Sequence, residues 1–487
     1  MASSENQYAA SIQGGDRTAR RFFAHSDAQR VSTDAVIAKS LTRQYPDLEL
    51  VIAPQYSSNL LGYAAAGHAS YTLLGDDCRS GSHGGGPGPG PGGSDLPSSL
   101  RWTSYVPPAR RIDGDAGYLA ETVVFGRFLY RWRSREFVVY LVDGRDGAMA
   151  VPRVDNFYVL APERAQAEAL VAAAGRWSAE LHGEVWVFDS GMWQKSAELY
   201  RSIQGAEWEN VILDEEMKKA IIEDHLSFFG SRDRYTRLKV PWKRGVIYYG
   251  PPGNGKTISI KAMMHMLYSR KPEIPTLYVR TLTSFFGPEY SIQQIFAKAR
   301  QFAPCYLVFE DLDTVVSDNV RSYFLNEVDG LKSNDGIFMI GSTNHLDRLD
   351  PGISKRPSRF DRKYYFPDPD RPQREAYCRF WQRKLAGSGG GDGGEDGVEF
   401  PDELIPAVAG ITHGFSFAYM QEAFVAALLA IARRTPREEE GGEGEEDLCD
   451  GWVGVRADGG GDLEGLVLWV EIKKQVAILR EGMEEGK

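Results

Sequence analysis

Two short stretches of the sequence carry residues that could bind and cleave a nucleotide phosphate. The first, GPPGNGKT, runs from Gly250 to Thr257 and matches the pattern G-x-x-x-x-G-K-[ST]. Its glycines would let the backbone wrap closely, so that several N–H groups converge on the phosphates. Lys256 would add a mobile cation, and the hydroxyl of Thr257 is a ligand for Mg²⁺. The stretch predicts a phosphate-binding loop with contacts from Gly250, Pro251, Pro252, Gly253, Asn254, Gly255, Lys256 and Thr257.

The second stretch, CYLVFEDLD from Cys305 to Asp313, is a hydrophobic run that ends in carboxylates. A buried strand of this kind delivers its last side chains to the edge of a sheet. Many nucleotide hydrolases have Asp and then Glu at this point, whereas the order here is Glu310 and then Asp311. Three interpretations stay open: a working site with exchanged acids, an inactive site, or acids that merely cap a strand in solvent.

Alternating strands and helices would hold both stretches at one edge of a sheet. Such alternation is typical of a parallel sheet with helices on both faces, so the expected fold class is α/β. The expected strands are 244–250, 276–280, 305–310 and 336–344, and the expected helices between them are 256–267, 291–302 and 320–331.

The motifs of residues 206–370 together resemble the ATPase module of the AAA family. PCYLVFEDLD resembles the second nucleotide motif of that family, FLNEVDGL and IGSTNHLDRLDPGISKRPSRFDRKYYF resemble its second region of homology, and GFSFAYMQEA resembles the start of its sensor-2 helix. Within the family, the chain most resembles the mitochondrial ATPases that assemble respiratory complex III, which also have Glu-Asp in place of Asp-Glu. The resemblance implies a P-loop NTPase AAA module with a C-terminal helical lid, ATP and Mg²⁺ as cofactors, and a homo-oligomeric ring of six or seven subunits.

The same resemblance implies roles for the acids and for the next strand end. Glu310 falls where the family holds Mg²⁺, usually through water, so that Thr257 and Glu310 would be the metal ligands. Asp311 falls where the attacking water is polarised, and Asn344 matches the sensor amide that orients this water. Asp313 matches a trailing Asp of the family, although N-capping of the next segment is equally plausible. Exchanging the acids moves each carboxylate by about one methylene, roughly 1.3 Å, which could slow hydrolysis without abolishing it.

Arginines after the next strand resemble the arginine fingers of the family. Arg359 and Arg362 match the two finger positions, and Arg356 is a weaker third candidate. Fingers of this kind reach into the site of the neighbouring subunit and neutralise transition-state charge. The alternative interpretation is that they are surface arginines paired with Asp361 or Asp368.

Two further segments resemble nucleotide-contacting parts of the family. The segment WENVILDEE is similar to the lining of the adenine pocket, which makes Val211 and Ile212 expected apolar contacts. No arginine stands in the first turn of the sensor-2 helix, so the lid is expected to sense nucleotide by packing, through Gly414 and Ser416.

The stretch SFFGPE matches the loop where many family members place aromatic residues toward a central channel. Phe285 and Phe286 could grip a protein client there. Paired phenylalanines are, however, most often buried in a core. The sequence leaves both interpretations open.

Four regions are expected along the chain. The alternating runs RFLYRWR and REFVVYLV predict a hairpin within a small α+β domain. This domain is loosely similar to the middle domain of the complex III ATPases, which carry a transmembrane helix before it, whereas no such helix is expected here. The expected regions are a mostly disordered tail and Gly/Pro linker (1–98), the small α+β domain (99–205), the large AAA subdomain (206–370) and the helical lid (371–487), with acidic or Gly-rich insertions near 387–397 and 436–461.

Composition excludes several classes of protein. The net charge of −11 over 487 residues argues against a general nucleic-acid binder. Four widely separated cysteines without a CxxC pair disfavour a disulfide scaffold or a zinc ribbon. The longest aliphatic stretch, FVAALLAIA, is too short to span a bilayer. The compartment is not fixed by the sequence, with the cytoplasm favoured over a mitochondrial location.

Three functions compete on these grounds. The leading hypothesis is a ring-forming AAA ATPase that remodels or assembles an unidentified protein client. The exchanged acids motivate a second hypothesis, a nucleotide-gated scaffold with little hydrolysis. A small-molecule kinase or a helicase is the third, and it is disfavoured by the GSTN and RPSRFDR tracts and by the acidic composition.

Overall fold

The chain divides into two compact units, Met1–Leu181 and His182–Lys487. The computed structural model describes residues 20–21, 24–25, 31–74, 99–108, 116–144, 155–329, 332–354, 356, 359–387, 398–433 and 463–485. The Gly/Pro linker at 82–94, the insertion at 436–461 and nearly all of the one near 387–397 lie outside the described residues.

The first unit is built on an antiparallel sheet of order β1-β6-β5-β4-β2, with β3 pairing with β4. The predicted hairpin is confirmed, because β4 and β5 pair antiparallel from Phe125↔Val142 to Trp132↔Arg135. The elements of this unit are α3 (Thr33–Gln44), β1 (Glu49–Pro54), α4 (Leu60–Ala65), β2 (Ser70–Leu73), β3 (Leu100–Val106), β4 (Tyr118–Trp132), β5 (Arg135–Asp143), β6 (Asp155–Ala161) and α5 (Arg164–Ala179).

The boundaries of this unit differ from the expected 99–205. The described segment 31–74 belongs to it, because Val51 and Leu60 are buried in the same core as Phe128. Residues 185–204 do not, because β7 (Val185–Asp189) pairs in parallel with a strand of the second unit. An apolar pattern can predict a strand, but not the sheet in which that strand finds its partner.

The second unit contains a seven-stranded sheet of order β13-β9-β12-β11-β10-β7-β8. Its neighbouring strands run parallel, except for β8, which pairs antiparallel with β7. The expected α/β fold with a parallel sheet is therefore confirmed. The strands are β8 (Met192–Ser196), β9 (Arg244–Tyr249), β10 (Thr276–Val279), β11 (Cys305–Phe309), β12 (Ile337–Thr343) and β13 (Arg362–Tyr365), beside β7.

Helices cover both faces of this sheet. On one face, Phe309 of β11 packs against Phe296 and Phe324 from two helices, α10 and α12. On the other face, His225 of α7 stacks on Phe338 of β12 at 4.2 Å between ring centroids. The helices of this part are α6 (Ala197–Gln204), η2 (Trp208–Asn210), α7 (Glu215–Gly230), α8 (Arg232–Leu238), α9 (Lys256–Tyr268), α10 (Pro288–Phe302), α11 (Leu312–Val315), α12 (Asp318–Asp329) and α13 (Pro351–Ser354).

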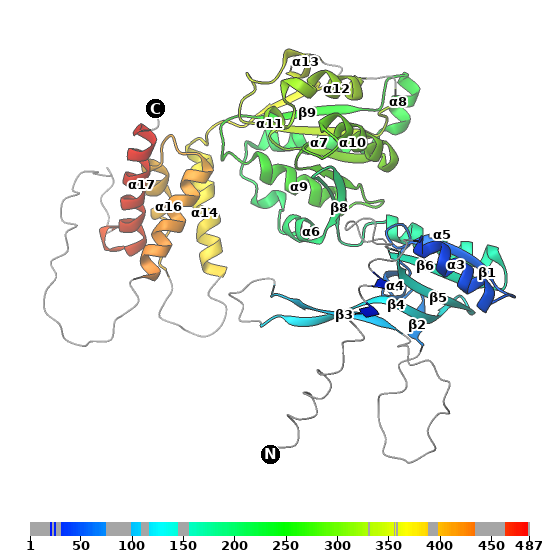
Figure 1. Cartoon of the computed structure of the whole chain (residues 1–487). Helices are drawn as coiled ribbons and strands as arrows, with labels where there is room; N and C mark the ends of the chain where they lie inside the picture. Colours follow the sequence, from blue (N-terminus) through cyan, green and yellow to red (C-terminus); the bar gives the residue numbers. More distant parts are fainter. Residues whose placement is uncertain are drawn as a thin grey trace, which may run out of the picture. The chain divides into compact units, whose positions relative to one another are not determined.

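The C-terminal part of the second unit is helical, and Figure 1 draws it in yellow to red. Its core joins Trp381, Phe424 and Trp469 from three different helices. Those helices are α14 (Arg371–Gly387), α15 (Leu404–Ile411), α16 (Phe417–Ala432), η3 (Leu463–Gly465) and α17 (Val467–Glu485). Across the described parts of the chain, every helix is too short or too polar to cross a membrane.

Candidate nucleotide site

The phosphate-loop sequence connects β9 to α9 at the carboxyl edge of the parallel sheet. β9 ends at Tyr249 and α9 begins at Lys256. Two glycines between them have backbones that only glycine adopts easily, with φ of 80° at Gly253 and 92° at Gly255. A Cβ atom at Gly253 would also lie 2.5 Å from the Cβ of Ala418. The loop is therefore shaped by its glycines and approached closely by the start of α16.

Lys256 lies at the first turn of α9 and is buried, with 8% of its surface exposed. Its Nζ donates hydrogen bonds to the carbonyl oxygens of Gly250 at 2.8 Å and Pro251 at 2.7 Å. Burial lowers the pKa of Lys256, and the charge of Asp311 opposes this shift. Lys256 and Asp311 are therefore close enough for their charges to interact.

Strand order brings the acids to the same edge as the loop. The sequence β9-β12-β11 in the sheet places one strand between them, and parallel strands end on the same side. Thr343, the last residue of β12, pairs with Tyr249. Asn344 therefore follows β12 at the level where Gly250 follows β9, and Glu310 follows β11 at the same edge.

Among the described residues, Glu310 accepts a short hydrogen bond at one carboxylate oxygen and has no hydrogen-bond partner at the other. The hydroxyl of Tyr278 donates to its Oε2 at 2.6 Å. Its Oε1 is buried and has no hydrogen-bond partner among the described residues. A buried carboxylate oxygen without a donor is costly unless a cation or a bound water satisfies it. Carboxylate and hydroxyl oxygens are ligands that Mg²⁺ prefers, so Glu310 and the exposed Thr257 fit that metal.

The metal would need further ligands from a nucleotide. In the described portion of the chain, no group of three or more His, Cys, Asp or Glu side chains could hold a metal ion by itself. Mg²⁺ bound to substrate phosphates usually takes only one or two protein side chains. The donor set is consistent with that mode of binding.

Asp311 stands at a sharp turn between β11 and α11. Its backbone has φ of 48°, in the left-handed region, and its N–H donates to Ser342 Oγ at 3.3 Å. Asp313 accepts a hydrogen bond from Thr343 Oγ1 at 2.7 Å. Asp311, not Asp313, holds the N-cap position of α11, so the alternative of N-capping by Asp313 is wrong.

A cleft of about 690 Å³ adjoins the loop. Such a volume falls in the range of small-ligand sites. Asn344 lines it together with residues of the loop and of β13. The lining residues are Tyr249, Gly250, Pro251, Pro252, Asn344, His345, Leu346, Asp347, Ser354, Lys363 and Tyr365.

The arginines lie near the amino-terminal ends of the strands, whereas the loop lies at the carboxyl-terminal ends. Arg362 begins β13 and pairs with Val246 of β9, and Gly250 follows four residues later, about 13 Å along the strand. A Cβ atom at Gly245 would lie 1.9 Å from the carbonyl oxygen of Arg359. Neither arginine is therefore at the loop of its own chain.

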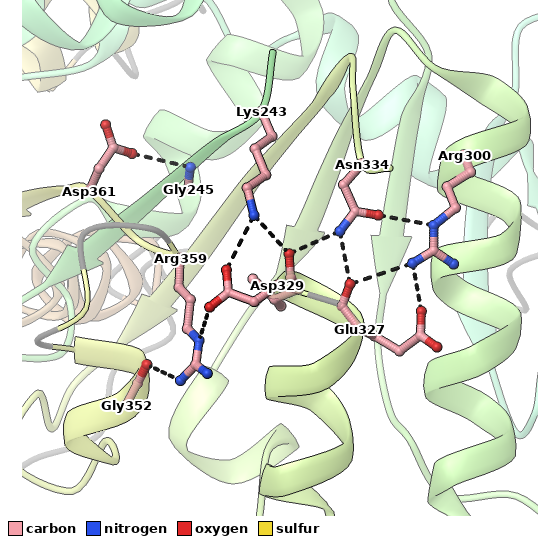
Figure 2. Close-up of polar contacts among 10 residues, drawn as sticks. Lys243, Gly245, Arg300, Glu327, Asp329, Asn334, Gly352, Arg359 and Asp361 are labelled. Atoms are coloured by element: carbon pink, nitrogen blue, oxygen red, sulfur yellow. Dashed lines mark hydrogen bonds and ion pairs between the residues drawn. The ribbon is translucent and has the colours of Figure 1, made fainter. Parts of the chain in front are cut away.

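Arg359 is held within its own chain. Figure 2 shows Arg359 and Lys243 converging on Asp329, the last residue of α12, with distances of 2.6 Å from Arg359 Nε and 3.2 Å from Lys243 Nζ. Arg359 also donates to the carbonyl oxygen of Gly352 at 2.6 Å. Burial raises the pKa of Asp329, but the hydrogen bonds from Arg359 and Lys243 outweigh burial and hold it below its ordinary value.

The alternative interpretation of these arginines named the wrong partners. Arg359, with 9% of its side chain exposed, pairs with Asp329 and not with Asp361 or Asp368. Arg362 has 58% of its side chain exposed and lies 3.6 Å from Asp224. Arg356 is exposed. Arg362 is thus the more accessible of the two finger candidates.

Four residues were expected to contact the nucleotide from outside the loop: Val211, Ile212, Gly414 and Ser416. The structure brings only the segment of Ser416 against the loop. Ser416 caps α16 by accepting from Tyr419 N at 3.4 Å, and the N–H of the nearby Ala418 donates to Gly253 O at 3.2 Å. Gly414 is exposed, with φ of 80°. Val211 is buried and Ile212 half-buried after η2, and the hydrogen bonds of the described residues link neither one to the loop.

Phe285 and Phe286 do not pack in a core. Their exposed fractions are 96% and 71%. The two rings contact each other at 5.4 Å, and Phe286 contacts Tyr290 at 5.1 Å between ring centroids. The alternative of core burial is wrong, and an exposed aromatic cluster remains.

Tyr278 and Ser342 were missed as parts of the site. Tyr278 pairs with Val308 on the neighbouring strand, so that it lies on the same face as Glu310. The strands TLYVR and GIFMIGSTN were expected, but apolar periodicity reveals neither which strands are neighbours nor their register. Only the strand order and register, which the sequence does not give, would have identified Tyr278 and Ser342 as neighbours of the acids.

Residues 246–368 match the family model described as "ATPase family associated with various cellular activities (AAA)". The match extends from β9 to just beyond β13, and it includes the loop, both acids, Asn344 and both arginines. The chain carries an AAA domain. The match covers residues 246–368 of the 487, which hold most of β9 and all of β10–β13, whereas β7 and β8 lie outside it.

Proposed function

We propose that the chain binds ATP with Mg²⁺ and hydrolyses it, and that it does so as a ring-forming protein remodeller or assembly chaperone. One observation carries the ATPase proposal. An AAA domain holds Lys256 of the glycine-shaped loop and the acids Glu310 and Asp311 at one edge of a parallel sheet.

Each residue at this edge has a chemical task in the proposal. The N–H groups of the loop and Lys256 bind the phosphates, and Thr257 and Glu310 hold the metal. Mg²⁺, when bound, neutralises charge on the transferred phosphoryl group. Asp311 accepts a proton from the attacking water, and Asn344 orients that water.

The exchanged acids favour one alternative, a nucleotide-gated scaffold with little hydrolysis. Asp311 is shorter than glutamate by one methylene, roughly 1.3 Å, and proton abstraction requires hydrogen-bond reach. Release of inorganic phosphate by the wild-type chain separates the two functions. Steady turnover supports the ATPase, whereas nucleotide binding without turnover supports the scaffold.

Two substitutions test the ATPase directly. Asp311→Asn removes the proton acceptor while leaving the loop intact, so that ATP binding should persist and turnover should fall by at least about 100-fold. Lys256→Ala removes the phosphate-binding cation, so that binding itself should weaken. Fluorescent-nucleotide binding and phosphate release measure both effects. Turnover that survives Asp311→Asn at the wild-type rate would contradict the assigned role.

The client-handling part of the proposal rests on the exposed aromatic cluster. Phe285 and Phe286 stand in solvent after β10, where they can contact an extended or a folded protein. Resemblance to the complex III assembly ATPases makes a mitochondrial assembly client one candidate. Trapping with Asp311→Asn in ATP, followed by identification of captured proteins, tests this part, and the Phe285→Ala/Phe286→Ala variant is its control.

A further inference from the structure

We propose that Tyr278 is a positioning residue for Glu310, which fixes one carboxylate oxygen so that the other faces the nucleotide-bound Mg²⁺. This inference rests on the proposed function, because it concerns the same metal. It assigns a task to a residue outside both sequence motifs.

Strand register places the two side chains together. Tyr278 of β10 pairs with Val308 of β11, and Glu310 lies two residues further along. Residues two apart on a strand share a face, so Tyr278 and Glu310 project to the same side of the sheet. The phenol of Tyr278 then reaches Oε2 of Glu310 at 2.6 Å.

The two oxygens of Glu310 have different surroundings. Oε2 accepts the hydroxyl of Tyr278, whereas Oε1 is buried without a hydrogen-bond partner among the described residues. A carboxylate can accept at both oxygens, so this arrangement leaves one buried acceptor for a cation or its water. The loop that binds the phosphates ends at the same edge of the sheet.

A glutamate at this position benefits from such an anchor. Its side chain has one more rotatable bond than the aspartate found in most relatives of this type, so more conformational freedom must be lost when it binds a metal. A tyrosine hydroxyl that is already bonded to Oε2 removes part of that freedom beforehand. Groups that hydrogen-bond to a metal ligand orient it and typically change metal affinity by about 10- to 100-fold.

The test is the Mg²⁺ dependence of nucleotide binding by the full chain. A fluorescent ATP analogue is titrated with Mg²⁺, and the half-saturating Mg²⁺ concentration is compared between the wild type and Tyr278→Phe. We expect about a 10- to 100-fold increase for Tyr278→Phe, with analogue binding in EDTA unchanged. This readout does not depend on hydrolysis.

Tyr248→Phe is the matched control. Tyr248 is a buried tyrosine of β9 that projects to the same face of the sheet, and its hydroxyl has no hydrogen-bond partner among the described residues. The Tyr248→Phe substitution removes a tyrosine hydroxyl from the same face of the sheet, but this hydroxyl makes no hydrogen bond to Glu310. Its Mg²⁺ dependence should equal that of the wild type.

A double-mutant cycle identifies the route of the effect. In a Glu310→Ala background, Tyr278→Phe should produce no further change, because the group that it orients is gone. An equal change in both backgrounds would overturn the proposal, as would an unchanged or tighter Mg²⁺ dependence of Tyr278→Phe alone.

Failure of this inference and failure of the proposed function give different results. A wild type that binds the nucleotide with Mg²⁺ but does not hydrolyse it removes the ATPase and leaves the role of Tyr278 measurable. A wild type that binds no nucleotide overturns both.

Discussion

Asp311 adopts a left-handed backbone at the point where the proposed water-activating carboxylate must be. Residues other than glycine enter this region at a cost, although aspartate tolerates it better than branched residues. Strain of this kind is often found at functional sites, where the surrounding structure holds it. The hydrogen bond from its N–H to Ser342 is one such constraint. The unusual order of the acids thus coincides with an unusual backbone.

His225 makes folding stability depend on pH. Burial lowers the pKa of His225 to about 4, and its Nδ1 donates to the carbonyl oxygen of Ile221 at 2.7 Å. Because the unfolded chain binds the proton more readily, stability is lost as pH falls from about 6.5 to about 4. Between pH 7 and pH 5 this histidine should cost the native state about 2 kcal/mol.

Denaturant unfolding at these two pH values measures the effect. His225→Phe keeps an aromatic ring against Phe338 and removes the titrating group, so that its loss of stability between pH 7 and pH 5 should be smaller by about 2 kcal/mol. His413→Ala, at an exposed position, is the control and should behave as the wild type. Equal pH dependence in all three proteins would show that His225 is not responsible.

At the scale of elements, β9 is joined tightly to the segment that carries the arginines. Asp361 N donates to Gly245 O at 2.9 Å, and Arg244 Nε lies 2.6 Å from Asp361 Oδ2. The backbone of Arg359 passes so close to Gly245 that a Cβ atom there would lie 1.9 Å from its carbonyl oxygen. Glycine inside a strand commonly marks such an approach.

Gly245→Ala should therefore destabilise the second unit. The added methyl group meets backbone and cannot be accommodated by a rotamer change, so we expect a loss of about 1–3 kcal/mol or more. Gly410→Ala is the matched control, since Gly410 lies in α15 and a Cβ atom there would meet nothing within 4 Å. That variant should gain up to about 1 kcal/mol from helix propensity. Thermal unfolding followed by circular dichroism compares them.

The sequence predicts the elements of the AAA domain better than their partners. The sequence predicts the strands 244–250 and 305–310 because buried parallel strands have nearly continuous apolar sequences. Which sheet β7 joins could not be predicted, since pairing depends on distant residues. The Tyr278–Glu310 and Arg359–Asp329 contacts could not be predicted for the same reason. Their partners are 32 and 30 residues apart in the sequence, respectively.

At the scale of the whole molecule, the position of the arginines bears on the number of chains in an active unit. Arg362 begins β13 at the edge of the sheet opposite to the loop, and 58% of its side chain is exposed. If Arg362 completes the nucleotide site of a neighbouring chain, the site of a single chain lacks that arginine. Specific activity should then fall on dilution, because the chains dissociate and the contact between the site of one chain and Arg362 of the next is lost.

Mixing two inactive variants tests that arrangement most directly. Lys256→Ala lacks a working loop but retains Arg362, whereas Arg362→Ala retains the loop, and loss of a finger lowers turnover by about 1,000-fold or more. In rings assembled at random from equal amounts, about a quarter of the interfaces combine an intact loop with an intact Arg362, because a ring contact joins two different surfaces. Activity should therefore recover toward about a quarter of the wild-type rate after co-refolding or co-expression. A mixture as inactive as its components would assign Arg362 a role within its own chain.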